Sequence, residues 1–142
     1  MLAASLRSLE WLVEVQVTSG GDFAPVGSNG FYTRGGPRAR FDQQPLEAAA
    51  MVSACLAAER VTHEERWHAH ARRAFDWYLG QNDLQVALYD ASTGGCRDGL
   101  HEDRVNENQG AESTLAFLLS LSEMRLADRT SAVSSAAAGS TT

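Results

Sequence analysis

The chain contains two copies of one segment, and this internal repeat limits the folds that it can adopt. Residues 41–47 align with residues 106–112, so that Gln44 corresponds to Gln109 and Glu47 to Glu112, an offset of 65 residues. Upstream, residues 9–12 align with residues 75–78 at an offset of 66. Repeats of this kind form arrays whose units bury their apolar faces against one another. We therefore expect two units, each made of a helix, a long loop and an apolar helix.

The spacing of apolar residues predicts four main helices. Residues 2–17 and 63–79 carry apolar side chains at intervals of three and four, which is typical of amphipathic helices. Residues 44–60 and 108–127 are apolar on almost every side, which predicts buried helices. Long loops follow the first and third helices, whereas the second connection is short. An all-α fold of antiparallel helical hairpins then places both long loops at one end.

These helices form a single domain over residues 1–127, with repeats at about 2–60 and 63–127. Residues 128–142 are rich in Ser, Ala and Thr and lack an apolar period, so we expect a disordered tail.

Composition excludes several classes of protein. A formal net charge of −6 gives no bulk attraction to nucleic acid or to an anionic membrane. No apolar run reaches the roughly 18–20 residues of a spanning helix. Arg7, Glu10 and Glu14 interrupt the N-terminal apolar segment, which is not the pattern of a signal peptide. We expect a cytoplasmic protein without nucleic-acid or membrane partners.

Two segments, residues 41–51 and 98–116, carry a resemblance to a known superfamily. They resemble the six-hairpin, glycosidase-like (α/α)6 toroids, and look like the helical toroid module that follows the catalytic domain in a group of bacterial sugar-nucleotide glycosyltransferases. The resemblance covers about residues 5–126. It implies a module of carbohydrate metabolism in which inner helices line a funnel and long loops at one end build a sugar site.

The chain offers only part of such a toroid, because two repeats cannot close a ring of six hairpins. The open flanks of its buried helices then need a cover, since large exposed apolar surfaces are rare on isolated proteins. The remainder of a longer parent chain or self-association would supply it.

Glu47 and Glu112 are candidate catalytic residues, because both lie in the first turn of a predicted buried helix. Packed helices lie roughly 8–10 Å apart, and inverting glycosidases hold two carboxylates roughly 6.5–9.5 Å apart. The alternative is that each Glu stabilises the N-terminus of its own helix. The sequence leaves both interpretations open.

Polar residues gather in matched positions before the two apolar helices, where amides and carboxylates could bind sugar hydroxyls beside an aromatic ring. The candidate substrate-binding residues are Tyr32, Asp42, Gln43, Gln44, Asp98, His101, Asn106, Asn108 and Gln109. Alternatively, their side chains fix the loops to the helix starts through bonds to the backbone.

The four histidines show no spacing typical of a metal site, and His68 and His70 would point to different sides of a helix. Asp98, His101, Glu102 and Asp103 do not have the spacing of a regular calcium loop. We expect no metal and no cofactor.

Three hypotheses follow. The first is a carbohydrate-handling module, associated with a bacterial glycosyltransferase, that binds a sugar or glycan at the loops. The second is a non-catalytic structural or oligomerisation repeat of a larger protein. The third is a fragment of a glycoside hydrolase or sugar epimerase. The chain contains no glycosyltransferase nucleotide-binding domain, so we expect no enzyme activity from it alone.

Overall fold

A computed structural model describes residues 1–139, with side-chain burial described through residue 132. The main helices are α1 (Leu2–Val15), α2 (Pro45–Thr62), α3 (Glu65–Asp76) and α4 (Ala111–Gly139). A short 3-10 helix, η1 (Trp77–Leu79), extends α3, and the strands β1 (Gly99–Leu100) and β2 (Val105–Asn106) pair antiparallel in the second loop. The fold is all-α, as the periodicity predicts.

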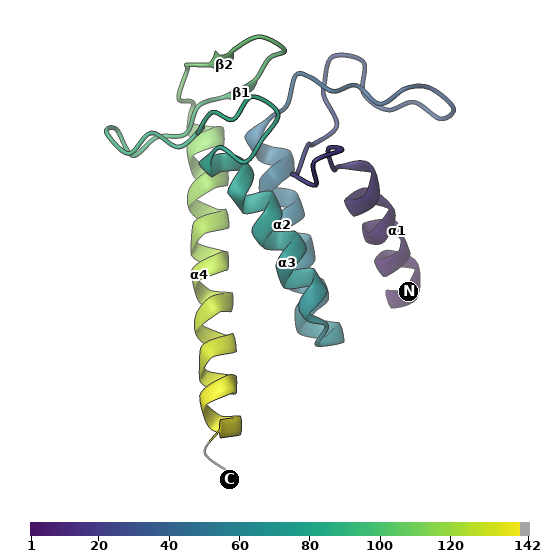
Figure 1. Ribbon diagram of the computed structural model, residues 1–142, viewed down its shortest axis with the longest axis vertical. Helices are drawn as coiled ribbons and strands as arrows, with labels where there is room; N and C mark the ends of the chain where they lie inside the picture. Colours follow the sequence, from purple (N-terminus) through teal and green to yellow (C-terminus); the bar gives the residue numbers. More distant parts are fainter. Residues whose placement is uncertain (140–142) are drawn as a thin grey trace.

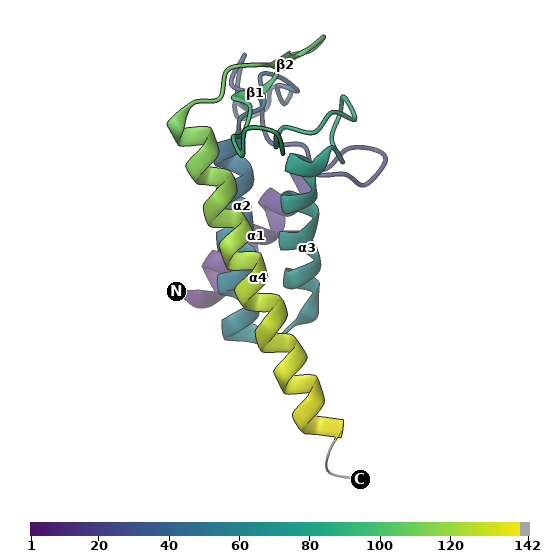
Figure 2. The same cartoon turned by 90° about the vertical axis from the view of Figure 1, so that its left-hand side faces the viewer.

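The helices run alternately up and down, and both long loops lie at the same end of the array (Figure 1). Figure 2 shows the same end from the side, with α4 crossing in front of α2 and beside α3. An isolated bridge between Gln43 and Leu100 joins the two loops to each other. We call this part of the molecule the loop end.

Local chemistry explains where α2 begins and where α3 and η1 finish. Pro45 is the first residue of α2, where its missing N–H costs no helical hydrogen bond. Gly80 follows η1 with a φ of 107°, a conformation that glycine adopts without the steric cost of a Cβ atom. The start of α2 and the end of η1 lie within one residue of the predicted ranges 44–60 and 63–79.

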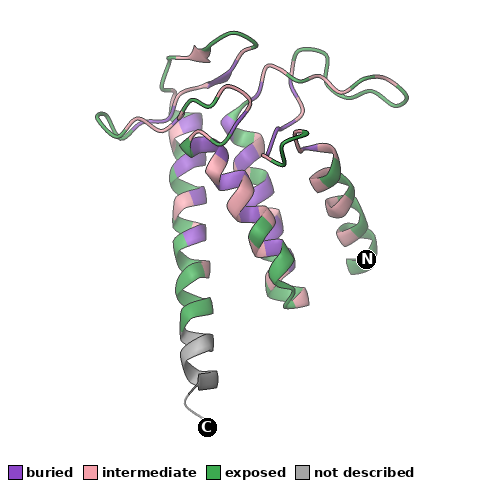
Figure 3. Cartoon of the chain, viewed as in Figure 1, coloured by how far each residue is buried: buried purple, intermediate pink, exposed green. Residues whose placement is uncertain are grey.

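The core lies between α2, α3 and α4 and is densest beneath the loop end (Figure 3). Phe117 of α4 forms its aromatic centre, with ring centroids 4.5 Å from Tyr89, 5.4 Å from Tyr78 and 5.9 Å from Phe75. Trp67 and Trp77 are both fully buried. Burial of such large side chains provides most of the stabilising free energy of the array.

The burial pattern of α2 and α4 follows the 65-residue offset of the repeat. Four pairs of corresponding positions are buried: Ala48 and Ser113, Met51 and Ala116, Val52 and Phe117, Cys55 and Ser120. Both helices also turn the same side to solvent, with Ala50, Ala57 and Val61 exposed on α2 and Leu115, Ser122 and Leu126 at the corresponding positions of α4. The two helices therefore occupy equivalent places in their units.

The structure differs from the predicted boundaries mainly in α4, which continues to Gly139 although the composition predicts disorder from residue 128. Alanine has the highest helix propensity, and Ala-rich sequence can extend a helix that packing has already nucleated. Residues 140–142 of the predicted tail lie outside the described residues. Within the described part of the chain, no helix is long and apolar enough to cross a membrane.

Candidate functional site

The residues singled out in the sequence gather at the loop end, but their side chains have different roles. They come from the starts of α2 and α4 and from the two loops that precede these helices. The repeat explains this placement, because corresponding positions of two parallel units lie at one end of the array. Their individual contacts separate those that hold the loops from those that remain free.

Gln43 is fully buried and holds the first loop in place. Its amide oxygen accepts a hydrogen bond of 2.8 Å from the indole N–H of Trp77, and its amide nitrogen donates to Asp83 and to the Arg40 carbonyl. Its backbone exchanges two hydrogen bonds with Leu100. The side chain of Gln43 thereby links the first loop and the second loop to η1.

Asp98 stabilises the start of α4 from a distant point in the chain. Its Oδ1 accepts hydrogen bonds from the Gly110 backbone N–H at 2.8 Å and from the Ser113 hydroxyl at 2.6 Å. A carboxylate in this position satisfies a free N–H group and interacts favourably with the helix dipole. Helix caps usually come from residues next to the helix in sequence, but here Asp98 of the second loop caps α4.

The other polar residues before α4 shape that loop. Asn106 accepts a 3.2 Å hydrogen bond from the Asn108 backbone. Gln109 accepts from the Thr93 hydroxyl at 2.7 Å and donates to Asp90 at 3.1 Å. Asn106 thus makes a bond to the backbone of the kind that the alternative predicts, whereas both bonds of Gln109 are to side chains. The amide of Asn108 is exposed.

Asp42 and His101 connect the two loops at the surface. His101 Nδ1 lies 2.7 Å from Asp42 Oδ1, and both side chains are partly exposed, at 29% and 38%. Gln44 follows as the N-cap residue of α2, with an exposed side chain that makes no capping bond. These three residues present polar atoms next to the start of α2.

Tyr32 lies further out on the first loop and stacks on Trp11 of α1. Their ring centroids are 5.9 Å apart and the planes differ by only 5°. A hollow of about 330 Å³ is lined by both rings together with Thr33, Arg34 and Gly35. The sequence analysis singled out Tyr32 but not Trp11, which is 50% exposed. Only the folded loop brings the two rings together.

Glu47 and Glu112 both lie in the first turn of their helices, as predicted. Burial of Glu47 raises the pKa of its carboxyl group, the backbone N–H groups of Glu47 and Gln44 act in the opposite direction, and the nearby charge of Glu112 raises it further. Oε2 of Glu47 is buried and has no hydrogen-bond partner among the described residues. Glu112 is exposed. Glu47 therefore combines a capping position with an unsatisfied oxygen that capping does not explain.

No group of three or more His, Cys, Asp or Glu residues within the described part of the chain is arranged to hold a metal ion. The arrangement at the loop end is instead one of carboxylates, amides and an exposed aromatic pair. No known protein-family pattern matches the chain, and no curated protein matches it.

Proposed function

We propose that the loop end binds a sugar or glycan, and that the chain is a cytoplasmic carbohydrate-handling module associated with a bacterial glycosyltransferase. The observation that supports this most directly is the buried, unpaired Oε2 of Glu47 at the start of α2. A buried polar atom without a hydrogen-bond partner costs free energy, and the unpaired Glu47 oxygen is the one such atom among the described residues that belongs to a carboxylate at the loop end. A sugar hydroxyl is a donor of the right kind, and the partly exposed Glu47 side chain would meet it by a change of rotamer.

The surroundings of Glu47 favour a polyhydroxylated ligand over a single ion. Glu112 is a second carboxylate close enough to affect the pKa of Glu47. Gln44 and the Asp42–His101 pair lie at the same end of α2 and offer both donors and acceptors. Small-molecule sites commonly combine a few such polar groups with an apolar surface. The proposal concerns binding, and assigns no catalytic step to the two glutamates.

Titration of the ¹⁵N-labelled chain with a panel of hexose disaccharides tests this proposal. We expect saturable chemical-shift changes at the first turns of α2 and α4 and in the loops before them. Glu47→Gln should weaken binding at least tenfold, because the amide cannot replace both acceptor oxygens of the carboxylate. Glu102→Gln is the control, since it removes an exposed carboxylate of the second loop. Unchanged affinity in Glu47→Gln, or shifts confined to other surfaces, would contradict the proposal.

The same substitution makes a separate prediction about stability. Because the folded-state pKa of Glu47 is raised, its ionisation is easier in the unfolded chain. The free energy of unfolding of the wild-type chain should therefore fall as the pH rises from the pKa that Glu47 has in the unfolded chain through its higher pKa in the folded chain. Glu47→Gln removes this loss, so its urea midpoint should exceed that of the wild type at pH 7 and approach it near pH 4. A lower midpoint at pH 7 would show that the carboxylate acts mainly as a helix cap.

A gain in stability with a loss of binding would be the signature of a residue kept for function. A gain in stability with no change in binding would refute the functional role while leaving the electrostatic argument intact.

The second candidate function is that of a structural or oligomerisation repeat, and α4 carries the observation that favours it. Four of its leucines are exposed, namely Leu115, Leu118, Leu119 and Leu126, with exposed fractions of 58%, 42%, 63% and 67%. Apolar surface of this extent marks a contact site. The two functions can coexist, because the leucines lie along the helix and the polar residues at its start.

A further inference from the structure

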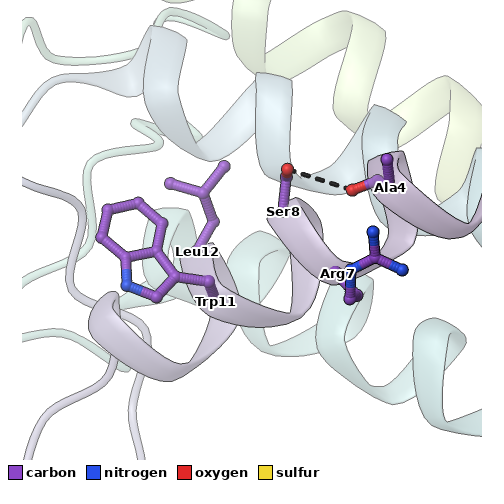
Figure 4. Close-up of a pocket in the computed structure, with 5 residues that line it drawn as sticks. All are labelled: Ala4, Arg7, Ser8, Trp11 and Leu12. Carbon is purple, nitrogen blue, oxygen red and sulfur yellow. Dashed lines mark hydrogen bonds between the residues drawn. The ribbon is translucent and has the colours of Figure 1, made fainter. Parts of the chain in front are cut away.

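The outer face of α1 is open, and it carries the larger of two hollows beside Trp11. This hollow of about 500 Å³ is lined by Ala4, Arg7, Ser8, Trp11 and Leu12, which all project from one side of the helix (Figure 4). Within Leu2–Val15 no side chain is fully buried. We call this surface the α1 face.

The repeat identifies what the α1 face corresponds to in the second unit. With the 66-residue offset, the residues that line the hollow correspond to His70, Arg73, Ala74, Trp77 and Tyr78. Ala74, Trp77 and Tyr78 are 0% exposed, whereas Trp11 is 50% exposed. The surface that is exposed on α1 in the first unit is therefore buried on α3 in the second unit.

The helix that covers this surface in the second unit is α2. The contact between α2 and α3 is the most extensive between helices in the described chain. Trp77 donates to Gln43 just before α2, and the Tyr78 hydroxyl donates to the Pro45 carbonyl at 2.6 Å. Near the other end, His68 lies 3.1 Å from Glu59. The hollow on α1 therefore corresponds to the surface of α3 that α2 covers.

The chain also carries an uncovered equivalent of α2, which is α4. Leu56 of α2 is 1% exposed, but its counterpart Leu121 is only partly buried. Leu118 beside it is 42% exposed, and its counterpart Ser53 donates a hydrogen bond to Glu123 of α4. At the start of the helices, the counterpart of the buried Gln43 is Asn108, which is exposed. We call the side of α4 that carries Leu118 and Leu121 the α4 flank.

We propose that the α4 flank of one copy packs on the α1 face and the neighbouring α2 of a second copy, and repeats between chains the contacts of α2 with α3 and α4 within the chain. The proposal continues an interface that already exists in the molecule, with Asn108 reaching Trp11 of the next copy as Gln43 reaches Trp77. The contact joins two different surfaces, so it is heterologous and leads to rings or open chains of copies. It would occupy Asn108 and Trp11, but it uses none of Glu47, Gln44 and Asp42, on which the proposed sugar site rests.

Light scattering over a range of concentrations tests the association. We expect a mass that rises above the monomer value of 15.3 kDa with concentration. Ser8→Glu and Leu118→Glu each place an unpaired charge in the contact, and each should weaken association at least tenfold. Their controls are Ala3→Glu and Leu126→Glu, whose counterparts Ala69 and Val61 are also exposed. Both controls should associate like the wild type.

A mixing experiment distinguishes this contact from other modes of association. Each blocked variant keeps one intact surface, so equal amounts of Ser8→Glu and Leu118→Glu should form a 1:1 dimer that does not grow further. A symmetric contact through the exposed leucines of α4 would instead let Ser8→Glu associate by itself, and it would make Leu126→Glu disruptive. That result, or a wild-type chain that stays monomeric at all concentrations, would overturn the proposal. Circular dichroism of each variant verifies that its helices are intact.

Discussion

Replacement of Trp77 by Ala should remove most of the stability of this fold. Trp77 is 0% exposed and packs edge-on against Tyr78, with ring centroids 5.3 Å apart. Removal of a large buried aromatic side chain costs about 3–5 kcal/mol because a cavity remains. The loss also leaves the Gln43 amide oxygen without its donor, which adds about 1–3 kcal/mol. Since domains of this size are stable by about 5–15 kcal/mol, urea denaturation should show a partly or largely unfolded chain.

The repeat provides a matched control for this experiment. Trp11→Ala removes the same side chain from the corresponding position of the first unit, where it is 50% exposed. We expect a loss of about 1 kcal/mol or less, mainly from the stacking on Tyr32. The two variants should be compared at concentrations where the chain is monomeric, because Trp11 also belongs to the α1 face. Equal losses would mean that the two units are packed alike, contrary to the burial described above.

The sequence predicted the parts of the fold that depend on local pattern. Apolar periodicity located all four helices, and it placed the start of α2 and the end of η1 to within one residue. The short connection between the second and third helices indicated that both long loops lie at one end, because successive helices in an antiparallel array run in opposite directions. The internal repeat then indicated that the starts of α2 and α4 would lie together.

The roles of individual site residues could not be predicted because their partners are remote in sequence. Gln43 bonds to Trp77, and Asp98 caps a helix that begins at Ala111; neither pairing leaves a local signal. Gln43 and Gln44 are adjacent and chemically identical, yet one is buried and the other exposed. Which of them can meet a ligand is decided by the path of the loop.

The path of the first loop depends on Gly27, and Gly27→Ala should disrupt the fold strongly although it leaves the helices untouched. A Cβ atom at this position would lie 2.0 Å from the Phe41 carbonyl oxygen and 2.5 Å from its nitrogen. These are backbone atoms, so they cannot move aside as a flexible side chain would. The residue also donates its N–H to the Ala39 carbonyl at 2.8 Å, and Ser28 donates to the Asp42 carbonyl at 2.8 Å. The methyl group would push apart two segments that the loop holds together.

We expect Gly27→Ala to lower the free energy of unfolding by about 2–3 kcal/mol or more, the upper part of the range for overpacking a tight contact. Gly20→Ala is the control, since its Cβ would meet nothing nearer than the Thr18 hydroxyl at 3.6 Å. That change should be neutral or stabilising by up to about 1 kcal/mol, because alanine restricts the unfolded chain. Urea midpoints measure both effects, and ¹⁵N shifts of Asp42, Gln43 and Gln44 report whether the loop end has moved. If Gly27→Ala were as stable as Gly20→Ala, the close approach to Phe41 would be absent in solution, and the placement of Asp42 and Gln44 beside Glu47 would lose its support.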